Sequence, residues 1–313
     1  MAVFYRSEDT IPTLPIVVKG KYNKLFSYVL IGGSSYKPAN FDKFEVSKKD
    51  DFYREFNYER EYPNINFQQD LSKITTTFSF SRPIDLLNNN LYEKNKYDIY
   101  IGSRSDLSIK KYAQFIRKLL NYHNVSPPYI FVGFSEGGWD SLAFAKYYPN
   151  LVEKIFFIDS FAGKAFEKYE IMRGNKKWFI ETTKGVFPPL PSKIDLNNRE
   201  DLEKVDEYNF NVKTYTFFRN REALLKINKS IPLIFYWAEN HWETVDGKIN
   251  LLGKPKSMIL FKKKYCKSLK NEYRLNVTEC RFFDAPHQIE RVLPVTLANF
   301  IKKASLNLNV SIK

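Results

Sequence analysis

Ser135 is the residue of this chain whose setting best fits nucleophilic chemistry. It lies in the G-x-S-x-G pattern of residues 133–137, after the apolar run Tyr129–Val132 and before a helical pattern over Trp139–Tyr148. A serine at the apex of a sharp strand-to-helix turn projects its hydroxyl above the sheet, and the small glycines let strand and helix approach closely. The pattern is short, and a glycine-rich turn beside a cofactor phosphate is the alternative interpretation.

A serine hydroxyl needs a base to take its proton near neutral pH, and histidine suits that role. The chain has three histidines, at positions 123, 241 and 287. His287 follows the apolar run Cys280–Phe283 and precedes the last helical pattern, so we expect it on a loop at the sheet edge where Ser135 emerges. His123 stands at the end of a helical pattern and is interpreted as a surface or capping residue.

Attack on a carbonyl creates an oxyanion, which needs backbone N–H donors. The amide of Glu136, next to Ser135 in the chain, is the first candidate. The second is the amide of Gly33 or Ser34, in the turn that follows the apolar run Leu25–Ile31. Glycines permit the backbone to turn inward with its N–H free. An ordinary glycine turn is the alternative for that segment.

Seven short apolar runs are predicted to be strands. Their nearly continuous apolar character is typical of parallel strands that are covered on both faces. They are Leu25–Ile31, Ile74–Phe80, Tyr97–Ile101, Tyr129–Val132, Ile155–Ile158, Pro232–Trp237 and Cys280–Phe283. Helical patterns separate several of them, at Ile109–Leu120 with Ser108 as a cap, at Trp139–Tyr148 and at Pro294–Lys303. This alternation predicts an α/β fold with helices on both sides of the sheet.

Two regions interrupt the alternation of strands and helices. Pro38–Ser72 carries many charged and aromatic side chains, and Phe161–Ser230 follows directly on a strand that ends in Asp159. We interpret residues 161–230 as an insertion that stands over the sheet and shapes a substrate pocket. Its aromatic residues favour a small-molecule substrate that is at least partly apolar. An extended surface excursion without functional contacts is the alternative.

Together these features resemble the α/β-hydrolase superfamily. The matching features are the glycine turn after Ile31, the serine turn, the strand Lys154–Ser160, the strand Pro232–Ala238 and Ala285-Pro286-His287 before a closing helix. The resemblance spans about residues 15–304 and implies a nucleophile elbow at the serine and a mostly parallel sheet of eight strands. It also implies one domain over residues 1–313, with a cap inserted at 161–230.

The acid of the expected Ser–acid–His triad is where the chain departs from the family pattern. Many members carry an Asp in a W-G-x-x-D arrangement, but here His241 stands four residues after Trp237. A histidine cannot be the anionic partner of the catalytic base. Asp159 resembles the acid that some lipases use after the sixth strand, and we favour it because a strand end is better fixed than a loop. Glu239 and Glu243 are the alternatives.

The resemblance implies a serine hydrolase in which Ser135, His287 and Asp159 cleave an ester, less readily an amide, through an acyl-enzyme. Superfamily members include esterases, lipases, epoxide hydrolases, dehalogenases, peptidases and non-catalytic receptors, so the fold does not name the substrate. A non-catalytic relative that binds a ligand or a protein is the second interpretation. The displaced acid favours it, and the intact serine and histidine oppose it. We expect no cofactor and no metal.

The chain has a net charge of +14, which could indicate an anionic partner. It is rich in Lys, Asn, Tyr, Phe and Ile together, as AT-rich codons would produce, so the charge alone does not establish one. The densest basic cluster lies among apolar residues at helical spacing and is interpreted as the solvated face of an amphipathic helix, without a nucleic-acid partner. It comprises Lys262, Lys263, Lys264, Lys267 and Lys270.

The cysteines and the N-terminus bear on location. Cys266 and Cys280 have neither metal-ligand nor redox-motif spacing, so we expect a reducing compartment. The first residues lack a basic flank followed by an apolar segment, and no apolar run approaches the roughly 20 residues that span a bilayer. These observations predict a cytoplasmic protein without a transmembrane segment.

Overall fold

A seven-stranded sheet organises the part of the chain that the computed structural model describes, namely residues 16–23, 25–32, 67–80, 109–161, 164–172, 176–186, 204, 211, 214–215, 217–245 and 248–306. The strand order is β1-β3-β2-β4-β5-β6-β9. Only β1 runs antiparallel to its neighbour, so the sheet is mostly parallel, as expected. The strands are β1 (Ile16–Lys19), β2 (Ser27–Ile31), β3 (Thr77–Phe80), β4 (Tyr129–Phe134), β5 (Val152–Ile158), β6 (Leu233–Ala238) and β9 (Val277–Phe283).

Six of the predicted strands are confirmed with small shifts of their ends, and the seventh, Tyr97–Ile101, lies outside the described residues. The sheet therefore has seven strands within the described ranges, where eight were expected. The edge strand β1 was not predicted. Neither was a separate antiparallel pair, β7 (His241–Val245) and β8 (Lys248–Gly253), which follows β6 in the chain.

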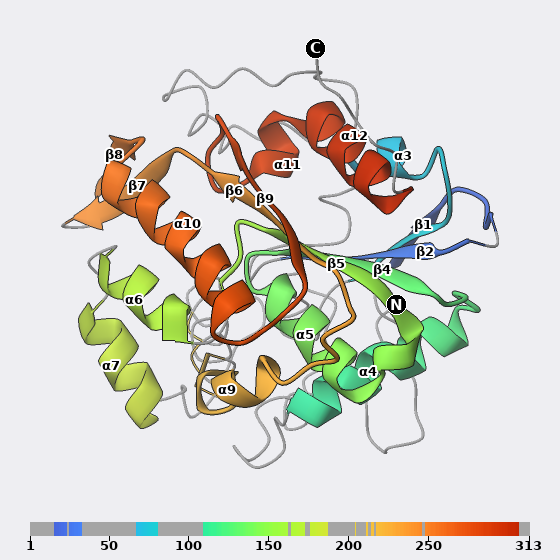
Figure 1. The fold of residues 1–313 in the computed structure, drawn as a ribbon, viewed down its shortest axis with the longest axis horizontal. Helices are drawn as coiled ribbons and strands as arrows, with labels where there is room; N and C mark the ends of the chain where they lie inside the picture. The colour runs from blue at the N-terminus through green and yellow to red at the C-terminus, as the bar shows by residue number, and fades with distance from the viewer. Residues whose placement is uncertain are drawn as a thin grey trace.

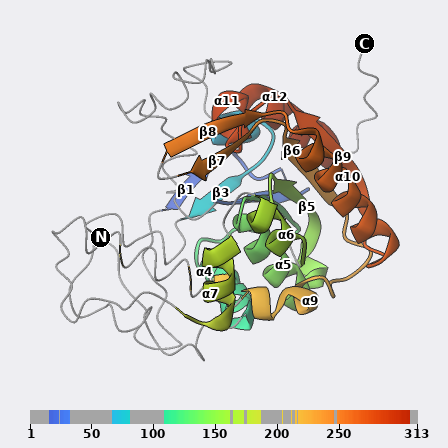
Figure 2. The same ribbon diagram turned by 90° about the vertical axis from the view of Figure 1, so that its left-hand side faces the viewer.

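Helices cover both faces of the sheet, and Figures 1 and 2 show α11 and α12 on one side of the strands and α4, α5 and α9 on the other. They are α3 (Phe67–Leu71), α4 (Ile109–Tyr122), α5 (Gly137–Tyr147), α6 (Lys164–Met172), α7 (Lys176–Lys184), α9 (Arg221–Leu224), α10 (Lys256–Asn271), α11 (Ile289–Val292) and α12 (Pro294–Ser305), with a 3₁₀ turn, η4, at Pro149–Leu151.

Successive residues of each central strand point to opposite sides of the sheet. In β5, Phe157 belongs to the core beneath α4, α5 and α10, while Phe156 and Ile158 belong to the core beneath α3 and α12. All three side chains are buried. Because both faces are covered, both sets must be apolar, and this is why the strands read as continuous apolar runs rather than as alternating patterns.

The amphipathic helix predicted around the lysine cluster is α10, but one of its lysines was assigned to the wrong face. Met258, Tyr265 and Leu269 are buried against the sheet, as their spacing indicates. Lys263 is exposed with the rest of the cluster, whereas the side chain of Lys262 is completely buried. Position 262 lies one turn after Met258, so helical geometry places it on the apolar face.

The two cysteines form a disulfide that joins α10 to β9, with their Cα atoms 6.5 Å apart. Cys266 and Cys280 are thus brought together by the fold, although their spacing matches no short motif. Disulfides are rarely kept in reducing compartments. The bond therefore counts against the expected reducing compartment, which stays a prediction.

Breaking this disulfide is expected to lower the free energy of unfolding by about 3 kcal/mol, the value of the chain-entropy model for a loop of roughly this length. The bonded cysteines are 14 residues apart in the chain. Urea denaturation with and without dithiothreitol measures the change. A Cys266→Ala/Cys280→Ala variant should start at the lower stability and show no response to the reductant. Equal stability of the wild-type protein under both conditions would contradict the bond.

The described parts of the chain between β5 and β6 include α6, α7 and α9, and they contact α5, β6 and α10. The ring of Phe161 lies tilted against that of Trp237 in β6, with centroids 4.6 Å apart, and Lys168 of α6 lies over the ring of Phe261 of α10 at 5.5 Å. The expectation that residues 161–230 form a cap stays a prediction, and the proline-rich stretch near residue 190 lies outside the described ranges. Among the helices described, none has the length and apolar character to cross a bilayer.

Candidate active site

Ser135 occupies a strained turn between β4 and α5. Its backbone φ is +49°, a conformation that side-chain-bearing residues adopt rarely and at a cost of about 1–3 kcal/mol. A Cβ built on Gly137 would lie 2.1 Å from the carbonyl oxygen of Ile31, so only glycine fits there. At Gly133 a Cβ would lie 2.5 Å from the backbone nitrogen of Gly138. The expected close approach of strand and helix around a partly exposed serine is therefore present.

The neighbouring strand β5 ends in Asp159, directly beside the serine turn. The backbone N–H of Ser135 donates to the carbonyl of Ile158 at 2.9 Å, and the N–H of Asp159 donates to the carbonyl of Tyr236 at 2.7 Å. Asp159 also has a positive φ, +44°. Since β4, β5, β6 and β9 are adjacent and parallel, the loops after them meet at one edge of the sheet. This is the edge at which open α/β sheets bind ligands.

His287 follows β9 and makes contact with Asp159. The imidazole Nδ1 lies 2.7 Å from the carboxylate Oδ2 of Asp159, across 128 residues of sequence. The aspartate side chain is 1% exposed and the histidine side chain 28% exposed. With Nδ1 held by the carboxylate, Nε2 is the ring nitrogen left to accept a proton, so the pair has the arrangement of an oriented general base.

The other oxygen of Asp159 is held by two further donors. The Nζ of Lys262 lies 2.5 Å from Oδ1, and the backbone N–H of Ala238 donates to the same oxygen at 3.1 Å. Lys262 also donates to the carbonyl of Ala238 at 2.8 Å. Sequence reasoning missed this lysine because it counted it with the surface cluster, although its position relative to Met258 carried the signal.

The alternative acids are not the partners of His287 among the contacts that the structure describes. Glu239 lies 3.2 Å from the Nζ of Lys254, which also pairs with Asp284 at 2.6 Å. Hydrogen bonds from Lys254 and Asn240 lower the pKa of Asp284 and keep this carboxylate ionised. The side chains of His241 and Glu243 lie outside the described part, and only their strand backbone in β7 is placed.

His123 lies away from this edge of the sheet. It follows α4, the helix that leads into the start of β4, and so stands at the opposite end of the strand from Ser135. Its ring is half-buried, 5.6 Å from the ring of Phe78 and 5.0 Å from that of Tyr122. Burial lowers the pKa of His123, because the charged imidazolium loses its hydration there. The ring of His123 is therefore packed against neighbouring aromatic rings, whereas a surface or capping residue was expected.

The candidate oxyanion donors are only partly placed. Glu136 directly follows Ser135 and is buried at the start of α5. Gly33 and Ser34 lie outside the described residues, where the chain is placed only as far as position 32. The carbonyl of Ile31 lies against Gly137. Residues 31–32, which precede the candidate donors Gly33 and Ser34, therefore lie beside the first turn of α5.

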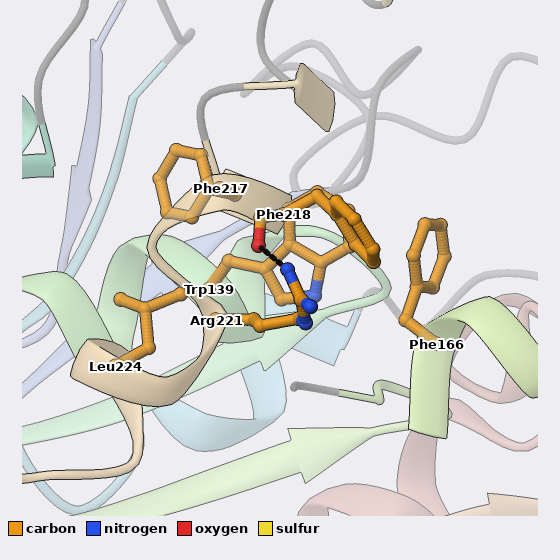
Figure 3. Close-up of a pocket in the computed structure, with 6 residues that line it drawn as sticks. All are labelled: Trp139, Phe166, Phe217, Phe218, Arg221 and Leu224. Atoms are coloured by element: carbon orange, nitrogen blue, oxygen red, sulfur yellow. Dashed lines mark hydrogen bonds between the residues drawn. The ribbon is translucent and has the colours of Figure 1, made fainter. Parts of the chain in front are cut away.

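A small aromatic pocket opens beside the first turns of α5 (Figure 3). It is lined by Trp139, Phe166, Phe217, Phe218, Arg221 and Leu224. Trp139 lies four residues after Ser135, and its indole N–H donates to the carbonyl of Phe161. The guanidinium of Arg221 lies 4.0 Å from the centroid of the Phe218 ring and donates to the carbonyl of Phe218 at 2.9 Å. Except for the tryptophan, every lining residue comes from the chain between β5 and β6.

No family model matches the sequence, and no curated protein does either. Solved structures do match across nearly the whole chain. A thermophilic esterase from Thermogutta terrifontis has a TM-score of 0.52 at 13% identity, covering 99% of both chains. A membrane phospholipase A described as a bacterial virulence factor has a TM-score of 0.52 at 17% identity, covering 98% of this chain and 85% of its own.

A carboxylesterase from Bacillus subtilis has a TM-score of 0.51 at 13% identity and covers 99% of this chain and 92% of its own. At identities this low, the similarity establishes a shared fold and does not establish a shared substrate. The shared architecture is a mostly parallel sheet flanked by helices. In this chain, that sheet places Ser135, Asp159 and His287 at one edge. The chain has the α/β-hydrolase fold.

Proposed function

We propose that this protein is a serine hydrolase that cleaves a carboxylic ester, and less readily an amide, through an acyl-enzyme. The observation that carries the proposal is the 2.7 Å contact between His287 and Asp159, on loops at the same sheet edge as the strained Ser135 turn. A structural aspartate at the end of β5 would not need to hold a histidine that arrives from a distant part of the chain.

In the proposed reaction, Ser135 Oγ attacks the ester carbonyl while Nε2 of His287 takes the hydroxyl proton. Asp159 keeps the imidazole in the required tautomer and stabilises the imidazolium. The backbone amides of Glu136 and of Gly33 or Ser34 hold the oxyanion. His287 then protonates the departing alkoxide, which leaves an acyl-enzyme on Ser135.

Water completes the turnover by the reverse sequence of proton transfers. His287 takes a proton from the water molecule as the water oxygen attacks the acyl carbon. The carbon–oxygen bond to Ser135 breaks, and the serine recovers its proton from the imidazolium. The products are the carboxylic acid and the alcohol, and no cofactor or metal takes part in any step.

The proposed substrate is partly apolar, and the proposed cap at residues 161–230 supplies most of the surface that would contact it. The lining of the aromatic pocket beside α5 supports this, because Phe166, Phe217 and Phe218 all come from that segment. A cytoplasmic location stays a prediction, and the Cys266–Cys280 bond counts against it.

A fluorophosphonate probe tests the nucleophile without knowledge of the substrate. The wild-type protein should be labelled at Ser135, and Ser135→Ala should abolish labelling, because only an activated serine attacks the phosphorus centre. Ser141→Ala, which removes the hydroxyl of a buried serine in α5, is the matched control and should label like the wild type. Labelling that persists in Ser135→Ala would sink the assignment, and an unlabelled wild-type protein would favour the non-catalytic interpretation.

A further inference from the structure

The ammonium group of Lys262 is buried in a place where an unpaired charge would be very costly. The side chain of Lys262 is 0% exposed, and that of its partner Asp159 is 1% exposed. Transfer of a lone ammonium from water into a protein interior costs several kcal/mol, so a buried lysine requires partners that hold its charge. Among the contacts described, the Nζ of Lys262 meets the carboxylate of Asp159, the carbonyl of Ala238 and the ring of Trp237, the last at 5.2 Å.

The two oxygens of the Asp159 carboxylate have different partners. Oδ2 faces His287, and Oδ1 receives hydrogen bonds from Lys262 and from the backbone of Ala238. The donors come from the loop after β9, from α10 and from the end of β6, so three elements fix the plane of the carboxylate. A carboxylate fixed in this way presents one oxygen to the imidazole in a single orientation.

The charge of Lys262 also changes what the carboxylate does for His287. An ammonium in contact with a carboxylate favours its ionised form, and at the same time cancels much of the field that the carboxylate exerts beyond the pair. The imidazolium form of His287 is then stabilised less than it would be beside an isolated carboxylate.

We propose that Lys262 is a positioning residue of the catalytic acid, which fixes the orientation of Asp159 and screens part of its charge from His287. This inference rests on the proposed function for its kinetic consequence. Its electrostatic consequence, a change at the ring of His287 when the lysine charge is removed, is independent of turnover and can be measured separately.

Other charged groups lie on the elements around His287 and contribute to its environment. Glu239 and Asp284 pair with Lys254 on the loops after β6 and β9, and Glu290 is buried in α11. Glu136 and Asp140 are buried at the start of α5. A substitution at Lys262 leaves all of them in place, so a comparison between variants isolates the lysine charge.

The decisive comparison is Lys262→Met against Lys264→Met in the full-length protein. Methionine replaces the lysine stem with a neutral side chain of similar length, and Lys264 is an exposed residue of the same helix, so its loss is the matched control. In Lys262→Met the acid limb of the pH profile of kcat/KM is expected to move up by about one pH unit. Activity on the acid limb then falls about tenfold, and it recovers substantially at higher pH because Ala238 still holds Oδ1.

Histidine NMR provides the readout that does not require activity. The chain has only three histidines, so ¹⁵N-histidine signals can be assigned with His123→Gln and His241→Gln variants. The signal of His287 should titrate about one pH unit higher in Lys262→Met than in wild type, and should not move in Lys264→Met. This shift in a protein without turnover would refute the proposed function and leave the role of Lys262 intact.

Two outcomes would overturn the role of Lys262. The first is an unchanged titration of His287 in Lys262→Met, with a loss of kcat/KM that is uniform across pH, which would indicate a structural lysine. The second is failure to fold. Lys262→Gln is the second variant for that case, because its amide retains a hydrogen-bond donor for Asp159 and lacks the charge. If neither variant folds, Lys262 is required for the fold itself and the proposal fails.

Discussion

His287→Gln is expected to lower the kcat for a p-nitrophenyl ester on the order of 10⁶-fold. Without the imidazole, Ser135 has no group to take its proton, and loss of the base alone in a triad costs about as much as loss of all three members. Glutamine is nearly isosteric with part of the ring and can still donate a hydrogen bond to Asp159, so the fold should be retained. Single-turnover kinetics with thermal unfolding of the same sample measure both quantities.

The matched control for this variant is His123→Gln. His123 is half-buried between Phe78 and Tyr122 at the far end of β4, so its loss should change packing slightly and leave the turnover rate near the wild-type value. A comparable loss of activity in the two variants would contradict the assignment of His287 as the base.

Asp159→Asn is expected to lower kcat by about 10⁴-fold, because the amide cannot hold His287 in the required tautomer or stabilise its charged form. The same change leaves the ammonium of Lys262 buried beside a neutral group, which destabilises the fold as well. The double variant Asp159→Asn/Lys262→Met removes that unpaired charge. It should regain stability relative to Asp159→Asn and should regain no activity, which separates the two effects.

Glu239→Gln is the control for the acid, because Glu239 pairs with Lys254 at the surface rather than with His287. Its removal should cost little, since partly exposed ion pairs contribute about 0–1 kcal/mol. A larger loss of kcat in Glu239→Gln or Glu243→Gln than in Asp159→Asn would return the acid to the segment after β6. Wild-type activity in all three variants would favour a serine–histidine pair without an acid.

The sequence by itself determined the features whose cause is local. Parallel strands buried on both faces must be continuously apolar, so six of the sheet strands could be located from composition. The turn at Ser135 needs glycine at position 137, because a Cβ there would collide with Ile31. Such requirements operate within a few residues of chain and leave a readable pattern. The short edge strand β1 and the β7–β8 pair left weaker patterns and were missed.

Only the tertiary structure decided which distant residues meet. Asp159, Glu239 and Glu243 all stood near strand ends in the sequence, and the adjacency of β5, β6 and β9 brings Asp159 to His287. The same packing pairs Cys266 with Cys280 across α10 and β9. The side chain of Lys262 points toward the sheet because of its position on α10, and there it pairs with the carboxylate of Asp159. A charge can be buried only beside its partner, and sequence spacing does not show where that partner lies.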